Sequence, residues 1–234
     1  MAAHSRFALI PAAGTGIRFG DRLRKQYVPI AGVPLLKRAI DSLHGAVVLD
    51  GVFVVLAKDD KDYGERIGSI QGVEPLYCGG ATRTESVRNG LAALSGHAQA
   101  EDWVIVHDAA RPCLDLATLH RLLHELEDEP VGGLLAVPLA DTLKRAETGA
   151  GLRATSTEAR EGLWCAQTPQ MFRFAILQHA LRKADPAKVT DEAQAIEALG
   201  VKPRLIQGSS ANIKVTYPED IALAEAILAA RSRT

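Results

Sequence analysis

Short, uninterrupted apolar runs recur along this 234-residue chain, and segments with helical spacing separate them. Such runs are typical of strands that are buried on both faces. The clearest runs cover 7–10, 52–56, 103–106, 133–137 and 204–206. Apolar residues at helical spacing predict helices over 35–43, 84–94 and 116–126, and Thr84 is expected to cap the second of these. This alternation predicts an α/β fold with a mostly parallel central sheet.

Weaker signals complete the pattern. A charged stretch over 58–67 predicts a helix, whereas 73–78 and 213–215 predict further strands. Asp191 and Glu192 open another helix, and acidic residues at the positive end of a helix have a purely structural reason to be there. A final helix is expected to open at residues 217–220, with its proline in the first turn, where no N–H is needed.

The segment 139–162 departs from this rhythm. Two short arms, 143–146 and 152–155, surround a glycine-containing turn and carry little that could be buried. A lone two-stranded hairpin is only marginally stable in water. The segment therefore predicts a projecting β-hairpin, which is either a floppy surface loop or an arm that clasps a partner subunit.

Composition places the chain among ordinary globular proteins, with 47% hydrophobic and 24% charged residues. The length suits one large domain over residues 1–234, without an appended second domain. The formal net charge of -1 provides no overall basic field that would attract nucleic acid or an anionic membrane. We therefore expect cations to act locally, and we expect neither nucleic acid nor a membrane as a partner.

The cysteines indicate a reducing compartment. Cys78, Cys113 and Cys165 are odd in number, far apart and without C-x-x-C spacing, so neither a disulfide framework nor a zinc site is predicted. No run of about 18 apolar residues occurs, and the first residues do not resemble a secretion signal. These features together predict a cytoplasmic protein.

A glycine-rich loop follows the first apolar run. Gly14, Gly16 and Gly20 precede several cations, an arrangement in which backbone N–H groups and positive side chains can hold phosphates. The dinucleotide fingerprint G-x-G-x-x-G fits poorly because the third glycine is one place late. A Walker A loop is excluded because Asp21 follows Gly20. An ordinary strand-to-helix turn with surface cations remains the alternative.

Further motifs occur downstream in a defined order: 79–87 (GGATRTESV), 106–112 (VHDAARP), 141–145 (DTLKR), 167–170 (QTPQ), 190–193 (TDEA) and 212–220 (NIKVTYPED). With the glycine loop, they closely resemble the 2-C-methyl-D-erythritol 4-phosphate cytidylyltransferase family over about residues 7–230. The resemblance implies a Rossmann-like nucleotidyltransferase domain. It also implies transfer of CMP from CTP to 2-C-methyl-D-erythritol 4-phosphate in non-mevalonate isoprenoid synthesis, forming 4-diphosphocytidyl-2-C-methyl-D-erythritol and pyrophosphate.

The resemblance assigns the catalytic cations. Displacement at the α-phosphorus spreads negative charge over phosphate oxygens, so positioned cations are expected to do most of the catalysis. The resemblance implies that Arg18 and Lys25 hold the triphosphate and stabilise the charged transition state, and that Lys214 reaches the α-phosphate region. As isolated residues, each of these would be an ordinary surface cation.

The resemblance also implies a set of CTP-binding residues: Ala12, Ala13, Gly14, Gly80, Ala81, Ser86 and Asp108. Gly80 and Ala81 are expected to present backbone groups to cytosine, with help from the Ser86 hydroxyl. Asp108 follows a buried strand and is the candidate ligand for Mg²⁺ or a similar divalent cation, which prefers carboxylate and phosphate oxygens. Its structural alternative is to cap the turn before Pro112.

The acceptor, a small polyol phosphate, is expected to meet residues that the same resemblance assigns: Arg111, Thr142, Thr168 and Thr190, with Arg160 supplied by the neighbouring subunit of a homodimer. Arginine suits phosphate because its planar donors match the phosphate oxygens. One departure is Arg24, which stands where the family often has proline before the loop lysine. The stiffness of that loop is therefore an open point.

Two rival functions differ in kind. A ribitol 5-phosphate cytidylyltransferase would share the loop pattern and the chemistry but use another acceptor. A nucleotide-binding regulatory module would lack catalysis, and the joint presence of Arg18, Lys25, Asp108 and Lys214 argues against it. Release of pyrophosphate with each alcohol phosphate distinguishes the first rival, and metal-dependent turnover distinguishes the second.

Overall fold

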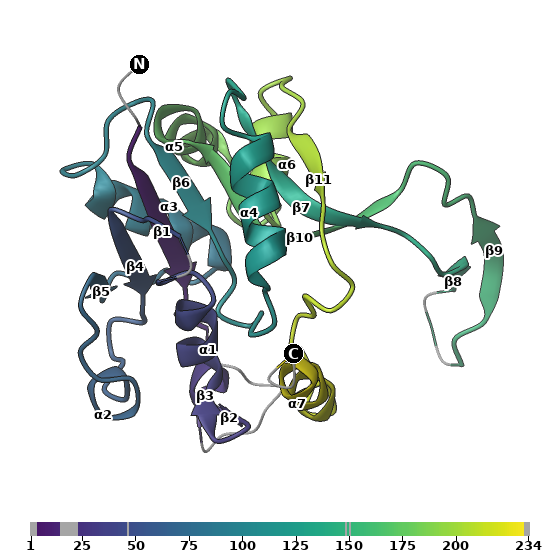
Figure 1. Ribbon diagram of the computed structural model, residues 1–234. Helices are drawn as coiled ribbons and strands as arrows, with labels where there is room; N and C mark the ends of the chain where they lie inside the picture. Colours follow the sequence, from purple (N-terminus) through teal and green to yellow (C-terminus); the bar gives the residue numbers. More distant parts are fainter. Residues whose placement is uncertain (1–3, 15–22, 46, 148, 150, 232–234) are drawn as a thin grey trace.

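The computed structural model describes residues 4–14, 23–45, 47–147, 149 and 151–231, and a seven-stranded sheet runs through its centre (Figure 1). The strands are β1 (Arg6–Pro11), β4 (Gly51–Val55), β5 (Val73–Leu76), β6 (Trp103–Val106), β7 (Gly132–Pro138), β10 (Trp164–Arg173) and β11 (Arg204–Gln207). Their order across the sheet is β11-β7-β10-β6-β1-β4-β5. Among these described strands, β10 alone runs antiparallel to its neighbours, so the prediction of a mostly parallel sheet is confirmed.

The described helices are η2 (Lys25–Tyr27), α1 (Leu35–Asp41), α2 (Tyr63–Arg66), α3 (Arg83–Leu94), α4 (Leu116–Glu125), α5 (Phe174–Lys183), α6 (Glu192–Glu197) and α7 (Asp220–Arg231). Of these, α1 and α4 pack on one face of the sheet, and α3, α5 and α6 pack on the other. Successive residues of β1 face opposite layers. Ala8 and Ile10 pack in the cluster formed with α1 and α4, whereas Phe7 and Leu9 pack in the cluster formed with α3, α5 and α6. Burial on both faces explains why the strands are continuous apolar runs in the sequence.

A smaller cluster lies beneath α7, next to the two-stranded ribbon of β2 (Pro29–Ile30) and β3 (Val33–Pro34). Its members are Ile30, Leu35, Cys113, Val215 and Ala224. The prediction of a strand over 213–215 is wrong, because these residues join no sheet in the described part of the chain. Instead, the Val215 N–H donates one hydrogen bond to the Ala110 carbonyl (2.8 Å). This bond holds the segment that carries Lys214 near the end of β6.

The starts of two helices differ from the prediction. Helix α3 is capped by Thr82, not by Thr84, in a reciprocal capping box with Glu85. Helix α7 begins at Asp220, so Pro218 lies in the turn before the helix and not in its first turn.

The helix predicted over 58–67 is only α2, which is four residues long. The Asp60 carboxylate explains the shortening, because it accepts hydrogen bonds from the backbone N–H groups of Asp62 (3.0 Å) and Tyr63 (3.3 Å). A side chain that binds nearby backbone donors in this way competes with helix formation.

The predicted hairpin is present as the ribbon of β8 (Leu143–Ala146) and β9 (Ala154–Glu158), which extends away from the sheet at the right of Figure 1. The first arm has the predicted bounds. The second begins two residues later than predicted, because the turn reaches Arg153, whose carbonyl accepts the Glu147 N–H (3.0 Å). We refer to residues 139–162 as the arm.

Candidate active site

An open pocket of about 440 Å³ lies at the edge of the sheet where β1, β5 and β6 end. Ligands gather at the carboxyl ends of strands in open α/β sheets. Residues that the sequence assigns to the nucleotide and to catalysis line this pocket together: Ala12, Ala13, Gly14, Lys25, Gly80, Ala81, Ser86, Asp108 and Lys214. Arg18, the remaining predicted catalytic cation, lies outside the described residues.

Gly79 and Gly80 allow the backbone segments around the pocket to pack closely. A Cβ atom at Gly79 would lie 2.3 Å from the Cβ of Ala13 and 2.7 Å from the Leu56 carbonyl oxygen. A Cβ atom at Gly80 would lie 2.3 Å from the Cβ of Glu85. These distances are too short for any side chain, so glycine is needed here because three backbone segments approach closely.

The backbone N–H groups of Gly80 and Ala81 already donate hydrogen bonds within the protein. The Gly80 N–H donates to Ser86 Oγ (3.1 Å), and the Ala81 N–H donates to Glu85 Oε2 (2.7 Å). The Ser86 hydroxyl in turn donates to the Thr82 carbonyl (2.9 Å). A flat base in this place would therefore meet a rigid, closely packed segment, and carbonyl oxygens are its available backbone partners.

Asp108 is buried two residues after the end of β6 and binds two cations. Its Oδ1 accepts from Arg83 Nε (2.7 Å), and its Oδ2 accepts from Lys214 Nζ (2.7 Å). Burial alone would raise the pKa of this carboxyl, but Arg83 and Lys214 override that effect and hold the pKa well below its usual range. Asp108 is therefore a carboxylate at neutral pH.

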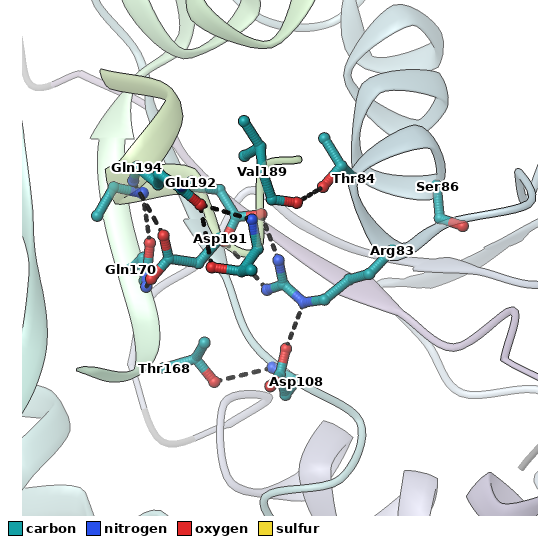
Figure 2. A network of polar contacts seen from close by, with 12 residues as sticks. Arg83, Thr84, Ser86, Asp108, Thr168, Gln170, Val189, Asp191, Glu192 and Gln194 are labelled. Atoms are coloured by element: carbon teal, nitrogen blue, oxygen red, sulfur yellow. Dashed lines mark hydrogen bonds and ion pairs between the residues drawn. The ribbon is translucent and has the colours of Figure 1, made fainter. Parts of the chain in front are cut away.

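Arg83 is the central residue of this arrangement, and sequence reasoning missed it. Figure 2 shows its guanidinium between Asp108 and Glu192. Its two terminal nitrogens donate to the two oxygens of Glu192, at 2.7 and 3.0 Å. Burial raises the pKa of the Glu192 carboxyl while Arg83 opposes that shift, and the two-point contact favours the carboxylate form. The predicted capping role of Glu192 at α6 gave no sign of this partner.

Further bonds anchor the start of α6 to its neighbours (Figure 2). Thr84 Oγ1 donates to the Val189 carbonyl (2.8 Å). Gln170 Nε2 on β10 donates to Asp191 Oδ2 (2.9 Å), and Gln170 Oε1 accepts the Ala193 N–H (2.9 Å). Helix α6 is thus attached to α3 and to the central sheet at once.

A buried histidine orders the residues around Asp108. The Nε2 atom of His107 lies 3.1 Å from the Arg111 carbonyl, which can only accept, so this nitrogen carries the proton. Its Nδ1 then accepts from the Thr168 hydroxyl (3.1 Å), whose oxygen accepts the Asp108 N–H (2.9 Å). Burial lowers the pKa of His107 to about 4, so the ring is neutral near pH 7.

The residues predicted for the acceptor are not gathered in the pocket. Arg111 is buried and donates to the Asn212 carbonyl (2.6 Å). Thr190 bonds to Gln194 through both its N–H (2.8 Å) and its hydroxyl (3.1 Å). Thr142 and Arg160 are exposed on the arm, where the Arg160 guanidinium donates to the Ala140 carbonyl.

The described residues do not fit a metal site built from protein groups. They contain no cluster of three or more His, Cys, Asp or Glu residues that could hold a metal ion. Asp108, the predicted ligand, has one cation on each oxygen at 2.7 Å. A divalent ion that bound Asp108 would have to share the carboxylate with these cations or replace one of them.

The chain matches the family described as 2-C-methyl-D-erythritol 4-phosphate cytidylyltransferase over residues 7–230. It is similar to the 2-C-methyl-D-erythritol 4-phosphate cytidylyltransferase of Dechloromonas aromatica (strain RCB), with 54% identity over 96% of this chain and 98% of the relative. The enzyme of that name from Nitrosospira multiformis is 54% identical over 95% of this chain and 97% of the relative.

Solved structures agree with these relatives. A crystal structure of a 4-diphosphocytidyl-2C-methyl-D-erythritol synthase superposes with a TM-score of 0.85 at 40% identity and covers 97% of this chain and 100% of its own. The Francisella tularensis 2-C-methyl-D-erythritol 4-phosphate cytidylyltransferase gives a TM-score of 0.80 at 31% identity, over 95% of this chain and 99% of its own.

Proposed function

The chain belongs to the 2-C-methyl-D-erythritol 4-phosphate cytidylyltransferase family, and we propose that the pocket beside Gly80, Asp108 and Lys214 is where its reaction takes place. The protein transfers CMP from CTP to 2-C-methyl-D-erythritol 4-phosphate, forming 4-diphosphocytidyl-2-C-methyl-D-erythritol and pyrophosphate in isoprenoid synthesis. The observation that carries the location is that two lysines, a carboxylate and the glycine segment line the same pocket.

On the nucleotide side, cytosine lies against the segment from Gly80 to Ser86, and the triphosphate lies along residues 12–14. The close packing at Gly79 and Gly80 supports this assignment, because it makes a rigid, narrow surface for a flat ring. The base amino group would donate to backbone carbonyls, since the Gly80 and Ala81 N–H groups are already used.

The cations act on the phosphates. Lys25 and Arg18 hold the triphosphate and stabilise the charge that develops during displacement, and Lys214 approaches the α-phosphate. The support is that Lys25 and Lys214 line the pocket, and that Lys214 extends from an otherwise anchored segment. These residues bind and orient the phosphates; the acceptor's own phosphate oxygen attacks, and pyrophosphate leaves.

On the acceptor side, the sequence assigns Arg111, Thr142, Thr168, Thr190 and Arg160. Thr168 works through position, because its hydroxyl already donates to His107 and accepts the Asp108 N–H. Arg160 belongs to the arm and acts at the site of the neighbouring subunit in a homodimer, whereas Thr142, at the start of the arm, is assigned to the acceptor with Arg111, Thr168 and Thr190. Leu152 on the arm and Trp164 at the start of β10 are exposed apolar side chains that a partner subunit could cover.

A divalent cation such as Mg²⁺ accompanies CTP. The family relation implies it, and when bound it neutralises charge on the phosphate oxygens. Because Asp108 already contacts Arg83 and Lys214, the triphosphate oxygens and water would be the principal ligands of such an ion. No step assigned to this chain's residues depends on Asp108 as a metal ligand.

The protein works as one domain in the cytoplasm. One sheet collects strands from Arg6 to Gln207, which supports a single domain. Cys78, Cys113 and Cys165 are free thiols. Within the described residues, no helix has both the length and the apolar character needed to cross a membrane.

One assay tests the function directly. Pyrophosphate release is measured with each of the four common nucleoside triphosphates, against both 2-C-methyl-D-erythritol 4-phosphate and ribitol 5-phosphate, with and without a chelator. We expect turnover only with CTP, the methylerythritol acceptor and a divalent ion. Equal turnover with ATP, preference for ribitol 5-phosphate, or full turnover in excess chelator would contradict the assignment.

A further inference from the structure

A chain of alternating charges connects the core to the pocket. It runs from the carboxylate of Glu192 through Arg83 and Asp108 to the ammonium of Lys214, with every link between 2.7 and 3.0 Å. Its inner end is fully buried, since the Glu192 side chain is 1% exposed, whereas Lys214 is 44% exposed at the outer end. Arg83, Asp108 and Lys214 line the pocket and Glu192 does not.

The two cations on Asp108 are held very differently. Arg83 stands at the first turn of α3 and makes three charged contacts, two of them to Glu192. Among the described residues, Lys214 makes one ion pair, to Asp108, and it lies on a segment without regular structure. A substrate phosphate could therefore draw Lys214 away, whereas Arg83 would have to break a two-point contact with a buried carboxylate.

Removing Lys214 from Asp108 would be costly without a second counter-charge. A buried carboxylate that loses its partner is strongly destabilising. Arg83 stays on Oδ1 when Lys214 leaves Oδ2, so Asp108 keeps a partner. Glu192 keeps Arg83 from following the phosphate, because it engages both terminal nitrogens of the guanidinium.

We infer that Arg83 and Glu192 are positioning residues that form a fixed ion pair and allow Lys214 to move between Asp108 and a substrate phosphate. This inference rests on the proposed function, in which Lys214 approaches the α-phosphate. The same pair links the nucleotide segment, which precedes α3, to Thr190, which precedes α6. The buried contact between Arg83 and Glu192 therefore positions both the segment assigned to the nucleotide and the segment that carries the acceptor residue Thr190.

Three variants test the inference: Arg83→Met, Arg83→Lys and Glu192→Gln. Turnover is measured as pyrophosphate release per CTP-binding site, with that number counted by calorimetric titration, so that a misfolded fraction does not lower the result. In Arg83→Met, Lys214 is the one cation among the described residues that still makes an ion pair with the Asp108 carboxylate, so we expect it to be held there. We expect kcat to fall roughly 10- to 100-fold, the range for losing a hydrogen bond to a charged group, while KM for CTP changes by less than about threefold because Lys25 and the loop remain.

The conservative variants separate positioning from packing. Compared with Arg83→Met, Arg83→Lys restores a positive charge, but its ammonium can contact only one of the two carboxylates, Asp108 or Glu192. Its kcat should therefore lie between those of wild type and Arg83→Met. Glu192→Gln keeps the shape but loses the charge that restrains Arg83, and it should also be intermediate. If Arg83→Met does not fold, the reduced kcat of the other two at unchanged KM for CTP still supports the inference, and wild-type kcat in both overturns it.

Arg204→Met is the matched control, since it removes an exposed ion pair with Glu125 (3.1 Å) on the far side of the sheet and should keep wild-type kcat. The pair of Arg83 and Glu192 would be merely structural if Arg83→Met kept kcat per CTP-binding site within about twofold of wild type. The same conclusion would follow if the kcat of Arg83→Lys were no higher than that of Arg83→Met. Failure of the wild-type protein to release pyrophosphate would instead contradict the proposed function.

Discussion

The polar groups beneath the pocket and those on the arm are stabilised in opposite ways. Beneath the pocket, Asp108 and Glu192 are buried and bind Arg83 with short contacts from different parts of the chain. On the arm, the ion pair of Arg145 with Glu158 (2.7 Å) joins side chains that are 67% and 38% exposed. The first set is fixed by the core, whereas the second is screened by water.

The difference shows which part of the site one chain can build alone. Exposed ion pairs contribute about 0–1 kcal/mol, so the arm's own contacts hold it only weakly in place. Leu152 is 79% exposed near the end of the arm, an apolar side chain without cover in a single chain. We therefore expect the nucleotide side to be complete in one subunit and the acceptor side to need a second.

The largest expected effect tests the nucleotide side. Lys25→Ala should lower kcat by roughly 30- to 900-fold, because a charged contact that strengthens in the transition state contributes about 2 to 4 kcal/mol. Arg18→Ala should behave similarly. Stopped-flow or steady-state pyrophosphate release measures the loss, and the melting temperature should barely change, since Lys25 lies at the pocket and not in the core.

The matched control for Lys25 is Lys188→Ala, which removes a lysine that is 83% exposed and paired with Asp185 at 3.5 Å. It should keep wild-type turnover. Unchanged turnover in Lys25→Ala would mean that Lys25 is an ordinary surface cation without a catalytic role. A loss of stability equal to the loss of activity would mean that Lys25 acts through folding.

The next effect tests the arm. If Arg160 acts in the neighbouring subunit, Lys25→Ala and Arg160→Ala are each nearly inactive alone, but their mixed dimer has one doubly damaged site and one intact site. Random pairing makes about half of the dimers mixed, so roughly a quarter of wild-type activity should return on co-expression. A purified mixed dimer without activity would place Arg160 in its own subunit's site or outside any site.

Features that depend on neighbouring residues could be predicted from the sequence, whereas features that depend on contacts between distant residues could not. The strands were predictable because burial on both faces leaves a local apolar run, and Asp108 because it follows such a run. The contact between Arg83 and Glu192 was not, because it joins residues 109 positions apart and both already had local explanations at helix starts. Tertiary packing alone brings the two together.

Lowering the pH should destabilise the buried residues around His107, next to the pocket, more than it destabilises the arm. Burial lowers the pKa of His107 to about 4, below its ordinary value near 6.5, so the unfolded chain binds more protons between these pH values. The stability that neutral His107 contributes is therefore complete above about pH 6.5 and is lost as pH falls towards 4. Between pH 7 and 5 we expect a loss of about 2 kcal/mol.

Chemical unfolding of wild type at the two pH values measures this loss, and His107→Gln should show a smaller pH dependence because its amide does not titrate. His179→Gln, at an exposed histidine on α5, is the control and should follow wild type. If hydrogen exchange showed the arm opening with acid while the residues around His107 stayed protected, the assignment of the acid-sensitive region would be wrong.

The smallest expected effect concerns Arg24, whose contacts are intermediate between the two regions. Its guanidinium pairs with exposed Asp59 (2.9 Å) and with buried Asp60 (3.4 Å), which also accepts the Tyr27 hydroxyl (2.9 Å). We expect these contacts to restrain the loop, as the proline that the family often has there would. The backbone of Arg24, at φ -60° and ψ 135°, already suits proline. Arg24→Pro should therefore keep kcat within about twofold, whereas Arg24→Ala, which loses both restraints, should lower it about threefold. A larger loss in Arg24→Pro than in Arg24→Ala would show that Lys25 depends on the charge of Arg24 and not on a stiff loop.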